Sequence, residues 1–112
     1  MKSAAPHPLE ISVDELARRR GGDEQVAVLD VRDPWEVEIC RLPDSIDVPL
    51  ARLPEQVDAL PREGMLVILC HHGMRSQHAA LWLRSHGFAN AVNLAGGIDA
   101  WARLIDPTMR TY

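Results

Sequence analysis

The residues best suited to chemistry in this chain are a cysteine and an arginine five positions later. Cys70 follows the apolar run Met65–Leu69, and Gly73 lies between Cys70 and Arg75. If a strand ends at the cysteine and a helix begins beyond it, the peptide N–H groups of the loop can converge on one point. Such surroundings stabilise a thiolate and bind anions. The spacing therefore predicts nucleophilic attack by Cys70 on a polarisable atom that carries an anionic leaving group.

The arginine adds a permanent positive charge with a fork of donors suited to an oxyanion. We therefore expect Cys70 to be catalytic and the rest of the loop to bind the substrate, through His71, His72, Gly73, Met74, Arg75 and Ser76. The two histidines beside a cysteine raise the alternative of a metal site. Consecutive residues rarely direct three side chains at one ion, so we expect neither a metal nor a cofactor.

The second cysteine, Cys40, has no glycine loop and no helix beginning beside it. We expect a partly buried structural thiol there. The alternative is a relay cysteine that accepts sulfur from Cys70. Two cysteines are too few for a disulfide framework, and a working thiol suits a reducing compartment, so a cytoplasmic location is expected.

Apolar runs and helix signals alternate along the chain. Ser12 and Glu15 form a capping box, and Asp33-Pro34 is a typical helix start. Strands are expected at residues 9–11, 26–30, 46–48, 65–69 and 91–94, and helices at 13–20, from 34, 53–60, 76–86 and 99–104. Alternation with short connections predicts one α/β domain with a mostly parallel sheet and helices on both faces. The expected boundaries are a loose lead-in at 1–8, the domain at 9–104 and a tail at 105–112.

Composition excludes several classes of protein. The chain has 112 residues, 16 acidic against 12 basic, and a formal charge of −4, which argues against nucleic-acid binding. No stretch approaches the roughly 20 apolar residues that cross a bilayer, so no membrane segment is expected. A chain of this length can bury a core without metal or disulfide support.

Four segments together resemble a rhodanese homology domain, over about residues 9–104. They are residues 29–36 (LDVRDPWE), 39–50, 70–76 (CHHGMRS) and 93–101 (NLAGGIDAW). The resemblance is strongest to small single-domain thiosulfate sulfurtransferases. It implies a five-stranded, mostly parallel sheet flanked by helices. It also implies that Cys70 takes a sulfane sulfur from thiosulfate, releases sulfite and passes the persulfide to cyanide or a thiol acceptor.

In such a domain the amides of residues 71–76 would hold the persulfide and Arg75 would orient the anionic donor. The loop has four residues between Cys70 and Arg75, as in sulfurtransferases, whereas related phosphatases and arsenate reductases have five. Asp30 and Arg32 match the family's Asp-x-Arg, and we expect a structural ion pair there. Trp35 and Trp101 are expected to pack in the core or at the rim of the site.

The chain departs from the family pattern at residues 40–45, where glycine, histidine and alanine positions are replaced. This puts the local turn in doubt rather than the activity. Two other functions stay open. One is a sulfur-relay or partner-binding module with a protein donor or acceptor, and the other is a redox-sensing module that uses Cys70 without turnover.

Overall fold

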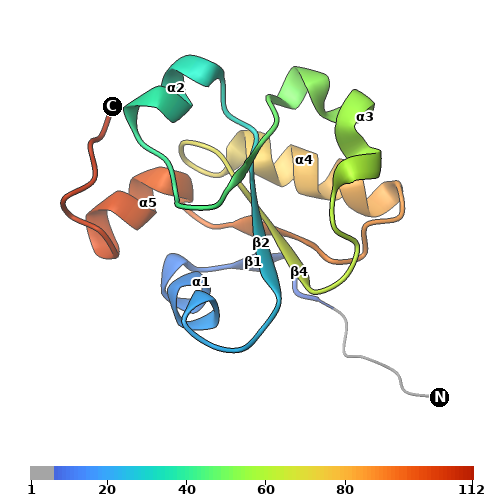
Figure 1. The fold of residues 1–112 in the computed structure, drawn as a ribbon, viewed down its shortest axis with the longest axis horizontal. Coiled ribbons are helices and arrows are strands. Elements are labelled where there is room, and N and C mark those ends of the chain that lie inside the picture. Colours follow the sequence, from blue (N-terminus) through green and yellow to red (C-terminus); the bar gives the residue numbers. More distant parts are fainter. Residues whose placement is uncertain (1–6) are drawn as a thin grey trace.

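The computed structural model describes residues 7–112, so most of the expected lead-in lies outside the described residues. The five strands are β1 (Glu10–Ile11), β2 (Val26–Asp30), β3 (Ile46–Asp47), β4 (Met65–Leu69) and β5 (Ala91–Leu94). They form one sheet in the order β1-β5-β4-β2-β3, and every pairing is parallel. The predicted α/β class with a five-stranded parallel sheet is confirmed (Figure 1).

Helices cover both faces of the sheet. They are α1 (Val13–Arg20), α2 (Pro34–Ile39), α3 (Leu53–Gln56), α4 (Met74–Ser85) and α5 (Gly97–Leu104). One apolar cluster joins α1 and α5 to the sheet through Leu16, Ile98 and Trp101. A second joins α3 and α4 to the opposite face through Leu53 and Leu83 (Figure 1). None of these helices is long and apolar enough to cross a membrane, within the residues that the structure describes.

The central strand explains why the sheet is covered on both faces. All five residues of β4 are buried, as expected for a continuous apolar run in a parallel sheet. Strands β2 and β5 flank it, so their carboxyl ends meet the end of β4 at one edge of the sheet. Cys70 is the first residue beyond that edge.

Several predicted helix boundaries are confirmed. Helix α1 spans the predicted residues, and the Ser12 hydroxyl accepts from the Glu15 amide at 3.1 Å. Helix α2 begins at Pro34, and the Glu36 carboxylate accepts from the Asp33 amide at 3.0 Å. These contacts satisfy N–H groups that a helix start leaves without partners.

The predicted helix at 53–60 is wrong in extent. Residues 50–59 instead form a 3₁₀ turn η1 (Leu50–Arg52), the four-residue α3 and a second 3₁₀ turn η2 (Val57–Ala59). Pro54 lies in the first turn of α3, where proline is tolerated, and Leu60 is extended before Pro61. The helical segment therefore ends at Ala59.

Two further helices begin earlier than predicted. Helix α4 begins at Met74 rather than residue 76, and α5 at Gly97 rather than residue 99. Each is preceded by a glycine in the left-handed region, Gly73 (φ 108°) and Gly96 (φ 80°). These glycines turn the chain sharply into the helix, which brings the first helical amides closer to the end of the sheet.

Candidate functional site

The sulfur of Cys70 faces peptide N–H groups. Its Sγ accepts from the Gly73 amide at 3.1 Å and from the Ser76 amide at 3.4 Å, and the Ser76 hydroxyl oxygen lies 3.3 Å away. The residue is 1% exposed, so these donors replace most of the solvent around the sulfur. Inward-pointing amides at a buried sulfur favour a negative charge at that place.

The loop turns its amides inward because its carbonyl groups are bound on the outside. The amides of Ile98 and Asp99 at the start of α5 donate to the carbonyls of Cys70 (2.9 Å) and His71 (3.0 Å). The Asn93 side chain donates to the Gly73 carbonyl at 3.2 Å. In a trans peptide the C=O and N–H point in opposite directions. Fixing these carbonyls therefore directs the N–H groups toward the space around Cys70.

Helix α4 contributes further donors. Its first hydrogen bond of the helical type runs from the Gln77 amide to the Gly73 carbonyl at 3.2 Å. The amides of Met74, Arg75 and Ser76 precede it and have no acceptor within the helix. The Ser76 amide already reaches the sulfur. These amides, with the positive end of the helix dipole, make the loop an anion-binding site.

Arg75 lies in the first turn of α4 rather than on the loop where it was predicted, and its charge is already paired. Its two terminal nitrogens each lie 2.8 Å from a carboxylate oxygen of Glu36. The Arg75 side chain is 37% exposed, whereas the Glu36 side chain is 3% exposed. The hydrogen bonds to Glu36 raise the pKa of Arg75 above its ordinary value. Arg75 is thus anchored on one side and open to solvent on the other.

Glu36 is the centre of a buried polar network. Besides Arg75, it accepts from the Asp33 amide and from the Tyr112 hydroxyl, which lies 2.7 Å from Oε1. The hydrogen bonds from Arg75, acting against burial, lower the pKa of Glu36 to about 2. Both carboxylate oxygens therefore accept from two donors each, which fixes the carboxylate and the guanidinium that it holds.

Asp30 and Arg32 form the predicted structural ion pair. Arg32 Nε and Nη2 donate to the Asp30 carboxylate at 2.9 and 2.6 Å, and both side chains are fully buried. Arg32 also donates to the carbonyls of Glu36 (3.1 Å) and Cys40 (2.7 Å). The pair therefore ties the end of β2 to the middle and the C-terminal end of α2, and so helps to place Glu36.

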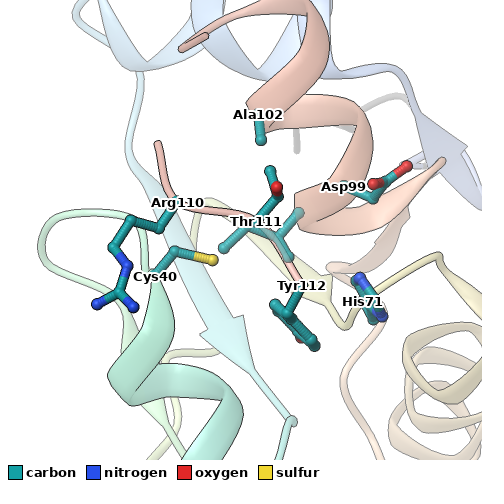
Figure 2. Close-up of a pocket in the computed structure, with 8 residues that line it drawn as sticks. Cys40, His71, Asp99, Ala102, Arg110, Thr111 and Tyr112 are labelled. Carbon is teal, nitrogen blue, oxygen red and sulfur yellow. The ribbon is translucent and has the colours of Figure 1, made fainter. Parts of the chain in front are cut away.

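The C-terminal tail returns to the loop. The Tyr112 ring stacks on the His71 ring, with centroids 3.9 Å apart and an interplanar angle of 13°, and meets Trp35 edge-on at 5.6 Å. Arg110, Thr111 and Tyr112 line a pocket together with Cys40 and His71, and Figure 2 shows the tail lying between those last two residues. Burial, followed by the proximity of His72, lowers the pKa of His71.

Cys40 is half-buried and lies outside the loop. Its sulfur is 3.9 Å from Arg32 Nη1, and it packs against the same cluster as Met109 and Tyr112. These contacts fit the structural thiol expected from the sequence. Figure 2 shows Thr111 and Tyr112 of the tail lying between the Cys40 sulfur and His71.

His71, His72 and Asp99 offer ligand atoms within 4.8 Å of one another. The two histidine rings face each other at a tilt, however, with centroids 3.9 Å apart and planes inclined by 32°, and His71 is also stacked on Tyr112. An ion bound by both imidazoles must lie near the plane of each ring, and rings that face each other do not meet this condition. Asp99 is also paired with Arg103 at 3.0 Å. The cluster as it stands is therefore a poor fit to a metal.

The two tryptophans expected in the core or at the rim of the site differ in their exposure. Trp101 is in the core at 8% exposed, whereas Trp35 is 59% exposed and Met74 72% exposed, each next to a residue of the Glu36–Arg75 pair. His78 and His86 are exposed, and His7 is partly buried.

Sequence reasoning missed three site residues: Glu36, Asn93 and Tyr112. Glu36 closes the segment 29–36 that carries the resemblance, but nothing in that segment gave it a role. Asn93 is a buried polar residue in the otherwise apolar strand Ala91–Leu94, and that contrast was the available signal. Tyr112 stands in no motif, so only the folded tail could identify it.

A family description for the rhodanese-like domain matches residues 12–104. The chain therefore belongs to the rhodanese-like family, whose general chemistry is sulfur transfer. It is 35% identical over 94 residues to a sulfurtransferase of Allochromatium vinosum, covering 84% of this chain and 88% of that protein. It is 37% identical over 79 residues to thiosulfate sulfurtransferase GlpE of Pseudomonas syringae, covering 70% and 74%.

Solved structures agree with the fold. A rhodanese-related protein from Thermoplasma volcanium has a TM-score of 0.77 at 32% identity, over 84% of this chain and 90% of that one. Several other relatives are much longer, and the chain spans only 25% to 37% of their length. The domain thus occurs both nearly alone and as part of larger proteins.

Proposed function

We propose that this protein transfers a sulfane sulfur from thiosulfate, or a related anionic donor, through a persulfide on Cys70. The observation that carries the proposal is the direction of the Gly73 and Ser76 amides toward Cys70 Sγ. The Cys70 thiolate attacks the outer sulfur of thiosulfate and forms a new S–S bond. The old S–S bond breaks and its electron pair leaves with sulfite. A thiol acceptor, or cyanide in an assay, then takes the outer sulfur and returns the thiolate.

The loop suits the charge that this step creates. In the persulfide the negative charge lies on the outer sulfur, one bond beyond Sγ. The amides of Met74 and Arg75 stand beside the Ser76 amide at the start of α4 and supply donors for an anion there. Arg75 would draw in the donor with the exposed side of its guanidinium. The loop has four residues between Cys70 and Arg75, which favours a single sulfur over a tetrahedral oxyanion.

The partners that we propose are a small anionic sulfur donor and a thiol acceptor. Both cysteines are free, which fits work in a reducing cytoplasm, where a thiol acceptor is abundant. The proposed catalytic chemistry uses side chains and peptide groups of this chain alone.

Intact mass spectrometry after incubation with thiosulfate tests the proposal. One added sulfur atom is expected, and cyanide should remove it. Cys70→Ser should show no addition, whereas Cys40→Ser, the matched thiol control, should load like the parent. Loading that persists in Cys70→Ser would place the chemistry on Cys40 and reject the proposal.

A protein-derived sulfur donor is the second candidate. Exposed Met74 and Trp35 present apolar surface beside the loop, and Arg75 is already neutralised by Glu36. A similar protein, the putative sulfur carrier protein YrkF of Bacillus subtilis, is 30% identical over 92 residues, covering 82% of this chain and 50% of that one. Loading from a protein persulfide faster than from thiosulfate, with a selective loss in Met74→Ser, would favour this candidate.

A further inference from the structure

Three polar side chains, those of Ser76, Asn93 and Glu10, are linked in series from the sulfur of Cys70. Ser76 Oγ is 3.3 Å from Cys70 Sγ and 2.6 Å from Asn93 Oδ1. A serine hydroxyl carries one hydrogen, so it donates to only one of these two atoms at a time. Which atom receives the hydrogen decides whether Ser76 stabilises or opposes a charge on the sulfur.

The orientation of the Asn93 amide is fixed by its other contacts. Its Nδ2 lies 3.0 Å from a Glu10 carboxylate oxygen and 3.2 Å from the Gly73 carbonyl oxygen. Both are acceptors, so the NH₂ group must face them and both of its hydrogens are used. The oxygen Oδ1 must therefore be the atom that faces Ser76.

The Ser76 hydroxyl donates its hydrogen to Asn93 Oδ1 rather than to the sulfur. Asn93 is 2% exposed, and Ser76 is the donor that reaches its Oδ1 among the described residues. Turning the hydroxyl toward the sulfur would leave a buried amide oxygen without a donor, which is unfavourable. Ser76 thus directs a lone pair, not a hydrogen, at Cys70.

We propose that Asn93 is a positioning residue that, acting through Ser76, disfavours the bare thiolate of Cys70 relative to the persulfide. A lone pair on Ser76 can accept the S–H of a thiol, but it opposes a charge on Sγ. When Sγ takes the outer sulfur and sulfite leaves, the charge moves to that outer sulfur and Sγ becomes uncharged. The opposition then disappears, so loading is favoured. This inference deepens the proposed function and rests on it.

The charged residues around Ser76 and Asn93 are not substituted in the test. Arg75, on α4, interacts electrostatically with Cys70, and Glu10, on β1, holds Asn93. His71 follows Cys70 directly in the loop. None of these residues is changed, so a difference between variants reports on Ser76 and Asn93.

The test is a double-mutant cycle on alkylation of Cys70 by iodoacetamide near about pH 7, resolved from Cys40 by peptide mass mapping. Asn93→Ala should release the Ser76 hydrogen to the thiolate and speed alkylation at least about fivefold. In a Ser76→Ala background the same substitution should give no such gain. Asn90→Ala, which alters another buried asparagine, should leave the rate unchanged in both backgrounds.

Ser76→Ala alone gives a second test if Asn93→Ala does not fold. It removes the opposing lone pair, so alkylation should become faster. A slower reaction would mean that Ser76 donates to the sulfur, and it would overturn the proposal. An equal gain from Asn93→Ala in both backgrounds would also overturn it. The assay needs no sulfur donor, so its outcome is independent of whether thiosulfate is the substrate.

Discussion

At the scale of single residues, the charge of Arg75 is paired with Glu36 before any sulfur donor binds. Both of its terminal nitrogens donate to Glu36, and its remaining N–H groups and exposed face are what a donor can meet. A dianionic donor must therefore bind beside an ion pair rather than to a free cation. We therefore expect Glu36, as well as Arg75, to influence the choice of donor.

Removing the Arg75 side chain should impair the use of an anionic donor. In Arg75→Ala we expect kcat/KM for thiosulfate to fall about tenfold or more, because a charge-assisted contact is lost. The kcat/KM for a neutral sulfane donor should fall less. Steady-state kinetics with both donors measures the difference, and Arg18→Ala, an exposed arginine on α1, is the control. Equal losses for the two donors would argue against an anion-binding role.

Glu36 should make the free energy of unfolding depend on pH in the acidic range. The pKa of Glu36 is lowered to about 2 in the folded chain from 4.5, chiefly by its hydrogen bonds with Arg75. A lowered pKa contributes stability that is present above the unfolded value and is lost as the pH falls toward the folded value. The shift corresponds to about 3 kcal/mol.

Denaturant unfolding at a series of pH values from about 5 to about 2 measures this contribution. The parent should lose stability steeply over that window. Glu36→Gln should be less stable at neutral pH and should show a flatter dependence. Glu38→Gln changes an exposed residue of the same helix and should follow the parent. The same steep slope in Glu36→Gln would assign the acid sensitivity to other carboxylates.

The proposed nucleophile and the proposed anion-binding residue both stand out in the sequence, but the residues that contact them do not. Cys70 and Arg75 are separated by one short loop, so spacing alone reveals them. Glu36 is 39 residues from Arg75 and Tyr112 is 76 residues from Glu36. Contacts over such separations depend on how the strands are ordered in the sheet, which no local pattern encodes.

At the scale of elements, the start of α5 shapes the catalytic loop. The amides of Ile98 and Asp99 hold the carbonyls of Cys70 and His71, and Gly97 lies directly against them. A Cβ at Gly97 would lie 2.4 Å from the Cys70 oxygen and 2.5 Å from the His71 oxygen. The glycine pair at 96–97, visible in the sequence as a turn, is therefore required for close approach of helix and loop.

Gly97→Ala should displace the loop. Its φ of 60° and the contacts of the new Cβ are both unfavourable, so we expect a loss of several kcal/mol in stability and loss of sulfur loading. Gly21→Ala is the control, since the nearest atoms to its Cβ lie at 3.7 Å and its φ is −85°. Thermal unfolding and intact mass measure both effects. Full loading in Gly97→Ala would show that the α5 contact is dispensable.

The strands and two helix starts were well predicted because each has a local cause. Buried runs such as Met65–Leu69 and caps such as Ser12 act within a few residues. The prediction for 53–60 failed because its apolar residues fit a helix, whereas the structure places a single α-helical turn between 3₁₀ segments and Leu60 is extended before Pro61. The early starts of α4 and α5 depend on left-handed glycines whose conformation is set by the loop that they complete.

At the scale of the whole molecule, the tail closes the domain over the site. Met109 and Tyr112 pack against the cluster that contains α1 and α5, while the Tyr112 hydroxyl reaches Glu36 on α2. Figure 1 shows the end of the tail beside α2. Arg32 donates to that hydroxyl at 3.1 Å, so the tyrosine must give its own hydrogen to Glu36. Tyr112 thereby joins the buried Asp30–Arg32 pair to the Glu36–Arg75 pair.

Tyr112 offers a direct spectroscopic check, because it is the only tyrosine in the chain. Burial, acting with the bond to Glu36 and against Arg32, raises the pKa of Tyr112 to about 12 from 10.0. An ultraviolet titration of the folded protein should show the phenolate appearing near that raised value, and a titration in denaturant should show it near the ordinary one. A raised folded value means that stability falls as the pH rises through it. Ionisation of the folded protein near the ordinary value would show that the tail does not hold this position.

The central claim is that the loop amides hold an anionic persulfide on Cys70, and a crystal structure of the thiosulfate-treated protein tests it most directly. We expect one additional sulfur atom bonded to Cys70 Sγ, within hydrogen-bonding distance of amides at the start of α4. Sulfur bonded to Cys40 instead, or an outer sulfur on Cys70 directed away from those amides, would contradict the account.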